Sequence, residues 1–414
     1  MKKLSFIALL CCMVVASVSA TTRKVLFIGN SYIYTNDMPL MLQTLATSLG
    51  DTLVYDQSTP GGHTFNQHTT NATTISKIFS QQWDIVILQE QSQLPSFDPT
   101  QVAAEVYPYA TRLDSMIHAN DTCTQTMFLM TWGRANGDAS NCAAYPPICT
   151  YWGMQQRLRE SYMEMAQTNN AVVAPVGMAY KVMRDSAYTP WLYSADESHP
   201  VVAGSYLEAC VLYGSIFHKR TRGASYLGGL TDTEAVRLQR IADKVVFDSL
   251  SLWQEHGHYP NAIFGGAVPG IGATVTFTSN SIEPASHLWN FGDATTDTAA
   301  GPAHTYTSVG TYVVSHTVST DCFTETQRDT LLIQGDGIAA IESTPVKIAA
   351  TGNGSVVYQL MADMDRLEIV DMRGVVVKRY SRDTLPATDN LVPGIYVYRV
   401  YANHRVGNYK VAVY

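Results

Sequence analysis

The stretch Lys-Val-Leu-Phe-Ile-Gly-Asn-Ser, residues 24–31, determines how the first half of the chain folds. Its four consecutive apolar residues, ended by a glycine, are typical of a buried parallel strand. Residues 39–49 follow with apolar side chains at helical spacing, so the stretch opens a strand–helix unit. Ser31 therefore lies at the turn between a strand and a helix.

The same alternation recurs further along the chain. Strands are predicted at 52–55, 83–88, 126–131 and 171–176, and helices at 102–119, 151–169, 178–184, 204–218 and 232–256. Strands that alternate with helices indicate a mostly parallel sheet with helices on both faces. In such sheets the chemistry is expected in the loops beyond the carboxyl ends of the strands.

The sequence pattern changes near residue 260. From there the helical spacing disappears, and short strands such as 273–278 and 311–318 lie between Gly and Asp turns. We therefore predict an α/β domain over 21–260, followed by two small all-β sandwich domains over 261–336 and 337–414.

Residues 1–20 have the layout of a cleavable secretory signal, with two lysines, an apolar stretch over 4–18 and small residues before the cut. We expect a secreted or cell-surface protein from which this segment is removed. The apolar stretch is short for a membrane-spanning helix, and no later stretch approaches about eighteen consecutive apolar residues. No transmembrane segment is predicted.

The charge of the chain argues against a nucleic-acid partner. The 414 residues carry a formal net charge of -8, and loss of the two lysines in the signal makes it near -10. Binding to phosphate backbones needs a concentrated positive surface, and the sequence has no basic run.

The cysteines indicate a disulfide rather than a metal site. Cys142 and Cys149 flank a loop-like segment and could close a small disulfide in an oxidising compartment, whereas Cys210 lies in an apolar run typical of a buried thiol. No pair has the spacing of zinc ligands, and no phosphate-binding loop or dinucleotide fingerprint is present. We therefore predict neither a metal nor a cofactor.

Two loops hold candidate catalytic groups. A serine hydroxyl needs a base to accept its proton, and Asp196-Glu-Ser-His199 could deliver a carboxylate and an imidazole to one cleft. If Asp196 accepts the Nδ1 proton of His199, Nε2 is free to act as the base for Ser31. Read singly, Ser31 is also explained as a helix N-cap, and the second loop as an Asp-capped turn with a surface histidine.

Attack on a carbonyl also needs donors for the oxyanion. The backbone N–H of Ser31 is one candidate, and Gly62, in the turn-rich loop over 59–64, is a second. Gln89, at the end of the strand over 83–88, offers a side-chain amide, with Gln91 as a competing choice.

In their order along the chain, these blocks resemble those of the SGNH (GDSL-like) hydrolases over residues 24–256. The resemblance implies a flavodoxin-like three-layer α/β/α sandwich that hydrolyses esters through an acyl-serine intermediate on Ser31. It also implies the partners Asp196 and His199 and an oxyanion hole that includes Gly62. Two departures are clear: Gly-Asn-Ser replaces Gly-Asp-Ser, and Gln89 stands for the asparagine of an absent Gly-x-Asn-Asp block.

Met-Thr-Trp-Gly, residues 130–133, resembles one subset of this family. On that basis Trp132 is a candidate lining residue of an acyl or sugar pocket, with a core tryptophan as the alternative. His63 is a further candidate for substrate contact, and His68 lies near the same loops.

The two β modules resemble known accessory domains. Leu-Trp-Asn-Phe-Gly-Asp, residues 288–293, with the segment that begins at His304, resembles a PKD repeat, in which a core tryptophan and a Gly-Asp turn brace an immunoglobulin-like sandwich. The segments 370–377, 391–400 and 410–414 resemble the C-terminal sorting domain of the type IX secretion system. That resemblance implies a Bacteroidetes-like bacterium and the secretion machinery as a partner.

Together these features predict a secreted serine esterase whose substrate is an acetylated carbohydrate or another small ester. The alternatives are a lipase or thioesterase, and a non-catalytic surface protein that binds glycans or mediates adhesion on the same scaffold.

Overall fold

The computed structural model describes residues 20–254, 264–266, 274–279, 286–333, 346–351, 355–360, 364–371, 376–386, 388–391, 394–402 and 405–413. The predicted signal segment therefore lies outside the described residues, apart from its last position. The chain divides into two compact units, Met1–Tyr259 and Pro260–Tyr414, and each is described by itself.

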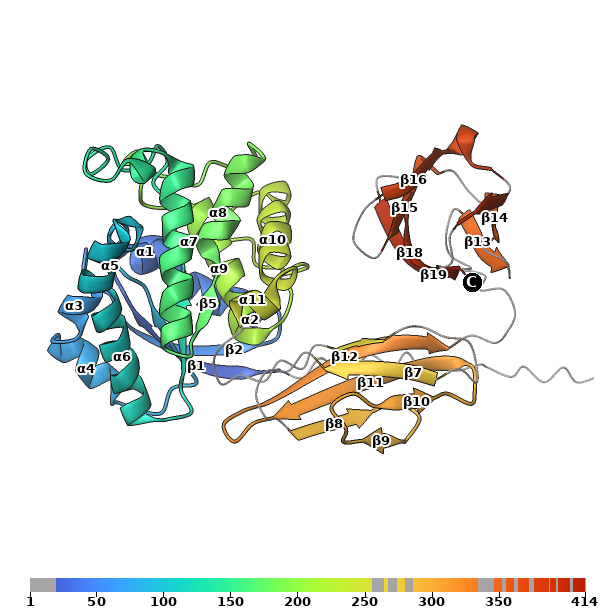
Figure 1. The fold of residues 1–414 in the computed structure, drawn as a ribbon, viewed down its shortest axis with the longest axis horizontal. Helices are drawn as coiled ribbons and strands as arrows, with labels where there is room; N and C mark the ends of the chain where they lie inside the picture. The colour runs from blue at the N-terminus through green and yellow to red at the C-terminus, as the bar shows by residue number, and fades with distance from the viewer. Residues whose placement is uncertain are drawn as a thin grey trace, which may run out of the picture. The chain divides into compact units, whose positions relative to one another are not determined.

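A five-stranded parallel sheet forms the centre of the N-terminal unit (Figure 1). Its strands are β1 (Thr22–Ile28), β2 (Thr52–Ser58), β3 (Ile85–Leu88), β4 (Gln125–Leu129) and β5 (Val172–Ala174). They lie in the order β2-β1-β3-β4-β5, the order of flavodoxin-like sheets. The connection reverses direction between β1 and β3, so the loops that follow these two neighbouring strands meet at one edge of the sheet.

Helices cover both faces of the sheet. They are α1 (Ser31–Tyr34), α2 (Met38–Ser48), α3 (Phe65–His68), α4 (Ala72–Ile78), α5 (Pro99–Glu105), α6 (Tyr107–Asn120), α7 (Tyr151–Thr168), α8 (Val176–Asp185), α9 (Val202–Phe217), α10 (Asp232–Phe247) and α11 (Leu250–Trp253). One layer contains α3 to α7, whose buried side chains share a core with Leu26 and Ile28 of β1. In the other, α9 packs against α2 and α10.

The strands are buried on both sides. Residues 25–28 of β1 have no exposed surface, and neither do residues 85–88 of β3. Because successive side chains of a strand point to opposite faces, this apolar run buries side chains under both helical layers. Each such side chain contributes on the order of 1.5–3 kcal/mol to burial, so the run in the decisive stretch anchors the fold.

Two predicted helices are interrupted. The helix expected over 102–119 is two helices, α5 and α6, which meet at Val106. Pro108 lies in the first turn of α6, where its missing N–H is tolerated, whereas it would break a continuous helix. The helix expected over 232–256 ends at Phe247 and resumes briefly as α11, and its last two residues lie outside the described part.

The C-terminal unit begins with a small antiparallel module. Its strands are β6 (Phe264–Gly266), β7 (Thr274–Ser279), β8 (Ser286–Asn290), β9 (Thr296–Asp297), β10 (Ala303–Thr305), β11 (Gly310–Ser319) and β12 (Thr324–Ile333), in sheets ordered β10-β7-β6 and β12-β11-β8-β9. Trp289 is fully buried in its core. Gly292 has a φ of +82°, and a Cβ there would lie 2.8 Å from a backbone atom of Val313, so the Gly-Asp turn requires glycine.

A second antiparallel module follows. Its strands are β13 (Val346–Thr351), β14 (Ser355–Leu360), β15 (Arg366–Asp371), β16 (Val376–Ser381), β17 (Thr388–Asn390), β18 (Gly394–Ala402) and β19 (Arg405–Val413), in sheets ordered β13-β14-β17 and β16-β15-β18-β19. Tyr398 and Leu367 lie in its apolar core. The predicted fold class, a flavodoxin-like α/β/α sandwich followed by two small β modules, is confirmed.

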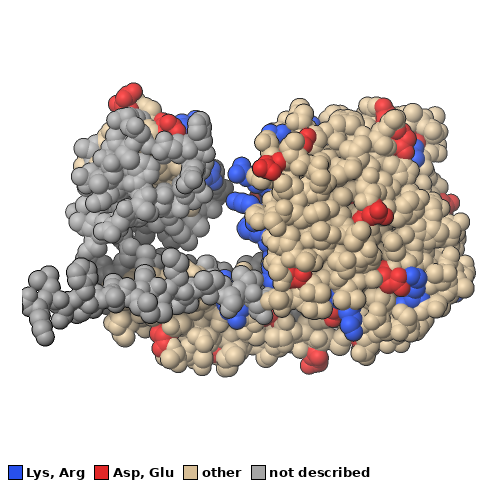
Figure 2. Space-filling view, turned by 180° about the vertical axis from the view of Figure 1, so that it is seen from behind, with Lys and Arg blue, Asp and Glu red and all other residues tan. Residues whose placement is uncertain are grey.

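The charged side chains are sparse, as the 15% content of charged residues predicts. The face of the N-terminal unit seen in Figure 2 is largely uncharged, with acidic and basic side chains spread over it. Among the described residues, no helix is both long enough and apolar enough to cross a membrane.

Candidate active site

The turn after β1 presents Ser31 at the edge of the sheet. Asn30, not Ser31, is the N-cap of α1, because the Asn30 side chain accepts the Tyr32 N–H at 3.2 Å. The hydroxyl of Ser31 is therefore not used for capping. Ser31 is also the first residue of α1, at the switch point between β1 and β3.

Ser31, His199 and Asp196 form a hydrogen-bonded relay. Ser31 Oγ lies 2.8 Å from His199 Nε2, and His199 Nδ1 lies 2.5 Å from Asp196 Oδ2. With the Nδ1 proton on the carboxylate side, Nε2 is an acceptor for the serine hydroxyl. The structure thus brings together the three residues that the sequence singled out, across 168 positions of the chain.

Asp196 is held as a carboxylate. Partial burial acts to raise its pKa, but hydrogen bonds from Ser194, His199 and the Ser198 N–H outweigh it and hold the pKa well below the usual range. The second carboxylate oxygen therefore remains an ionised acceptor for the imidazole at neutral pH. Half of the Asp196 side chain is exposed, so the acid end of the relay is open to solvent rather than buried in the core.

The loop that carries Asp196 and His199 is a narrow hairpin. Ser194 N–H donates to the His199 carbonyl at 2.8 Å, and Val201 N–H donates to the Leu192 carbonyl at 2.9 Å. Glu197, at the tip, has a φ of +61°, in the left-handed region that non-glycine residues rarely adopt. Such a strained conformation persists only where surrounding contacts hold it. One of these contacts is a hydrogen bond from the Ala135 N–H to the Glu197 carbonyl, at 2.8 Å.

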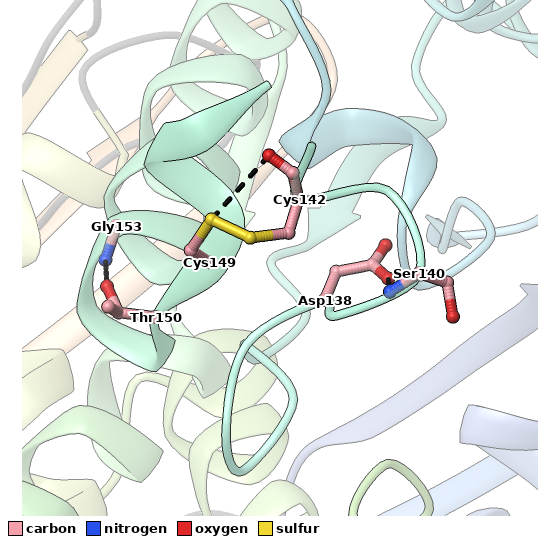
Figure 3. Close-up of a disulfide and its surroundings, with 6 residues drawn as sticks. All are labelled: Asp138, Ser140, Cys142, Cys149, Thr150 and Gly153. Carbon is pink, nitrogen blue, oxygen red and sulfur yellow. Dashed lines mark hydrogen bonds between the residues drawn. A yellow bond between two sulfur atoms is a disulfide. The ribbon is translucent and has the colours of Figure 1, made fainter. Parts of the chain in front are cut away.

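The residues that follow Ala135 in the chain form a loop closed by a disulfide (Figure 3). Cys142 and Cys149 are joined, which confirms the predicted pair, and Thr150 caps α7 directly after it. The buried carboxylate of Asp138 accepts from Gln93 Nε2 at 2.7 Å and from Asn141 Nδ2 at 2.8 Å. The disulfide loop is therefore tied to the segment after β3. Cys210 is a buried free thiol, as predicted.

Gly62 offers a backbone donor beside the serine turn. Its φ of +69° favours glycine, and it is exposed. Within the described part of the chain, neither the Gly62 N–H nor the Ser31 N–H has a hydrogen-bond acceptor. Asn30 Nδ2 donates to the His63 carbonyl at 2.9 Å, which fixes the glycine loop to the serine turn.

The structure corrects the assignment of Gln89 as an oxyanion donor. Gln89 is fully buried; its Oε1 accepts the Asn30 N–H at 2.9 Å, and its Nε2 donates to the Glu90 carbonyl. Gln91 does not take its place, because Gln91 Oε1 accepts the Gln93 N–H at 2.8 Å and Nε2 faces its own loop. Gln89 is instead a brace between the ends of β3 and β1.

Glu90 is a buried group that the sequence does not single out, and His68, which is expected near these loops as a possible substrate contact, is fully buried instead. Burial raises the pKa of Glu90 to about 8, although its carboxylate accepts the N–H groups of Gln91 and Phe65. Burial lowers the pKa of His68 to about 4, so this imidazole is neutral and bridges the Gly29 carbonyl and Thr74 Oγ1, at 2.9 and 2.8 Å. Both groups hold the loops of the site from below.

Two other predicted contacts are also placed differently. Trp132 is fully buried, so it does not line an exposed acyl or sugar pocket, and the core alternative holds. The ring of His63 lies 5.3 Å from that of His68, and its Nε2 lies 3.5 Å from Asn71 Nδ2, at the rim of the glycine loop.

Among the described residues, no three His, Cys, Asp or Glu side chains come together as metal ligands.

A family model matches the first part of the C-terminal unit. Residues 268–334 match the family model described as the PKD domain. Over 106 residues the chain is 39% identical to a microbial collagenase from Vibrio alginolyticus, a match that spans 24% of this chain and only 11% of that protein.

Several solved structures are similar to parts of the chain. A DUF4886 family protein from Bacteroides uniformis is 19% identical, with a TM-score of 0.48, over 55% of this chain and 96% of its own. The psychrotrophic esterase EstA from Pseudoalteromonas sp. is 15% identical, with a TM-score of 0.35, over 47% and 97%. The PKD1 domain of the metalloprotease PrtV from Vibrio cholerae is 32% identical, with a TM-score of 0.18, over 19% and 99%.

Fold and site together define the N-terminal unit as an α/β protein with a Ser-His-Asp relay at the switch point of a flavodoxin-like sheet. Its parallel five-stranded sheet is similar to that of SGNH hydrolases. The chain adds a PKD domain to this unit.

The raised pKa of Glu90 predicts a pH-dependent stability. Because the folded state keeps a proton that the unfolded state has lost, the free energy of unfolding falls as pH rises towards 8, by at most about 1.4 kcal/mol per pH unit. His68 acts with the opposite sign, and only below about pH 6.5. Urea unfolding between pH 6.5 and 8 should therefore show a smaller decline in Glu90→Gln than in the wild type.

Tryptophan fluorescence is the suitable signal, because five of the six tryptophans lie in the N-terminal unit. Glu105→Gln, at an exposed position, is the matched control and should keep the wild-type slope. Equal slopes in Glu90→Gln and the wild type would contradict the buried, protonated carboxyl.

Proposed function

We propose that the N-terminal unit is a serine esterase. The observation that carries the proposal is the relay from Ser31 Oγ through His199 to Asp196, at 2.8 and 2.5 Å. These are hydrogen-bond distances for a nucleophile, its base and the group that orients the base. The order of the sequence blocks supports the same assignment.

The reaction proceeds in two halves. Ser31 Oγ attacks the ester carbonyl carbon while His199 Nε2 takes the hydroxyl proton, and the carbonyl electron pair moves onto the oxygen. Collapse of this intermediate expels the alcohol, which takes the proton from His199 and leaves an acyl group on Ser31. Water then attacks the acyl carbon while His199 takes one of its protons. Collapse of this second intermediate breaks the bond between the acyl carbon and Ser31 Oγ, the proton passes from His199 to Ser31 Oγ, and the acid departs. Asp196 keeps the imidazole in one tautomer throughout.

The N–H groups of Ser31 and Gly62 hold the oxyanion in this proposal. Both lack an acceptor within the described residues and lie on loops tied together through Asn30. Fixed backbone donors stabilise the developing charge at little reorganisation cost, and one such donor is typically worth about 3–4 kcal/mol. Gln89 acts beneath them as a support.

The substrate we propose is an O-acetylated carbohydrate. Trp191 is 57% exposed and lies directly before the hairpin arm that pairs with residues 199–201, so the loop that carries the base also carries an exposed aromatic side chain. Trp152 is 53% exposed, and the Arg184 guanidinium lies 5.8 Å from its ring and 5.3 Å from that of Trp191. Indole faces suit the apolar faces of sugar rings.

Export is part of the proposal. The segment 1–20 reads as a signal, and the disulfide between Cys142 and Cys149 fits an oxidising compartment. The C-terminal module is proposed as the sorting domain that the type IX secretion machinery recognises, and the PKD domain as a spacer. The mature protein would be secreted or attached to the cell surface.

The nucleophile is tested with a fluorophosphonate probe, which labels activated serines. Wild-type protein should be labelled, and Ser31→Ala should lose both labelling and more than about a thousandfold of kcat on p-nitrophenyl acetate. Ser80→Ala, at an exposed serine, is the control and should be labelled normally. Absence of labelling in the folded wild type would sink the esterase and favour a non-catalytic glycan-binding role.

The substrate class is tested by acetate release from a panel of O-acetylated glycans. Trp191→Ala should lower the ratio of kcat/KM on the preferred glycan to that on p-nitrophenyl acetate by about tenfold, equivalent to about 1.4 kcal/mol of lost stacking. Phe79→Ala, at a 49% exposed phenylalanine of the α4 C-cap, should leave the ratio unchanged. Preference for long-chain p-nitrophenyl esters, without acetate release from any glycan, would indicate a lipase or thioesterase instead.

A further inference from the structure

A buried aromatic stack lies directly behind the catalytic hairpin. The ring of Trp132 lies between those of Tyr32 and Tyr180, at centroid distances of 4.5 and 4.3 Å and interplanar angles of 2° and 4°. All three side chains are at most 2% exposed. Tight burial in a parallel stack leaves these rings little freedom to move.

Two polar groups of this stack converge on Ser198, the residue before His199. Trp132 Nε1–H donates to the Ser198 carbonyl at 3.0 Å, and Tyr32 Oη lies 2.6 Å from Ser198 Oγ. Ser198 is 7% exposed, so these bonds are shielded from water. Because buried polar groups are costly to leave unpaired, the two bonds fix both the backbone and the side chain of Ser198.

Tyr32 links the two halves of the relay. It directly follows Ser31 in α1, and its ring meets the His199 imidazole edge-on, with centroids 5.5 Å apart. One side chain therefore connects the nucleophile turn to the residue beside the base. The far end of the stack is also fixed, since Tyr193 packs against Tyr180 and its hydroxyl donates to the Gly133 carbonyl at 2.8 Å.

We propose that Tyr32 and Trp132 are positioning residues that hold His199 Nε2 within hydrogen-bond reach of Ser31 Oγ by gripping Ser198. The inference rests on the proposed function for its kinetic consequence, but not for its geometry. Neither side chain forms a hydrogen bond to the relay atoms, so the hydrogen bonds of both act through Ser198, while the Tyr32 ring also packs against the imidazole.

The test is a double-mutant cycle on the bond between Tyr32 Oη and Ser198 Oγ. Tyr32→Phe and Ser198→Ala each remove that bond while the stack and the Trp132 contact remain. Each should lower kcat on p-nitrophenyl acetate about tenfold at unchanged KM, within the hundredfold that a 1 Å misplacement can cost. The double variant should lose no more than Tyr32→Phe alone, because that substitution already deletes the bond to Ser198 together with the contact of the Tyr32 hydroxyl with Ser92.

Tyr180→Phe is the matched control. It deletes a buried hydroxyl of the same stack that has no hydrogen-bond partner among the described residues, so kcat should not change. A lower melting temperature in Tyr32→Phe with wild-type kcat would overturn the proposal, because it would mean a structural role only. So would additive losses in the double variant.

Crystal structures of the wild type and Tyr32→Phe separate this inference from the proposed function. The distance between Ser31 Oγ and His199 Nε2 should lengthen from 2.8 Å beyond about 3.5 Å in the variant, whether or not the protein hydrolyses esters. An unchanged distance would refute the positioning role of Tyr32 even in an active enzyme. A lengthened distance in a protein that fluorophosphonates do not label would support the positioning role and refute the proposed esterase activity.

Discussion

The hydrogen bond from the Asn30 N–H to the buried Gln89 Oε1 is the constraint on which the site depends. It joins the ends of β1 and β3, the two strands between which the sheet reverses its connection, and it fixes the residue before Ser31. A side chain at Gly29 would displace this bond, because a Cβ there would lie 2.5 Å from the same oxygen. The strand therefore has to end in glycine for the brace to form, and the brace has to form for Ser31 to project from the edge of the sheet.

Around that bond, the loops of the site are held from beneath by buried polar groups. Glu90 accepts the Phe65 N–H at 3.0 Å, His68 holds the Gly29 carbonyl, and Asn30 holds the His63 carbonyl. Burial disfavours the charged forms of Glu90 and His68, so both supports are close to neutral near pH 7. The ionised group is instead Asp196, which is half exposed to solvent and accepts a hydrogen bond from the imidazole of His199. The buried groups that support the loops are thus neutral, and the charged group of the relay, Asp196, is exposed.

Much of this arrangement could be predicted from the sequence. Apolar runs such as residues 25–28 predict buried parallel strands. Ser31, Asp196 and His199 are predicted because their blocks, in this order, resemble those of the SGNH hydrolases, whereas each block read alone is also explained as a helix cap or a turn. The role of Gln89 could not be assigned, because the sequence does not tell whether a glutamine at a strand end turns its side-chain amide towards the active site or towards the core. Trp132 was ambiguous for the same reason. The break before α6 could have been found from Pro108, whereas the braces of Glu90 and His68 depend on long-range contacts that no local pattern encodes.

The central claim is that the relay is a working nucleophile with its oxyanion site on the N–H groups of Ser31 and Gly62. The most direct measurement is a crystal structure of the protein after reaction with a small alkyl phosphonate, whose tetrahedral phosphorus mimics the intermediate. We predict a covalent bond from Ser31 Oγ to phosphorus, with the phosphonyl oxygen about 3 Å from both nitrogens. An adduct on another residue, or a phosphonyl oxygen turned away from both N–H groups, would contradict this account.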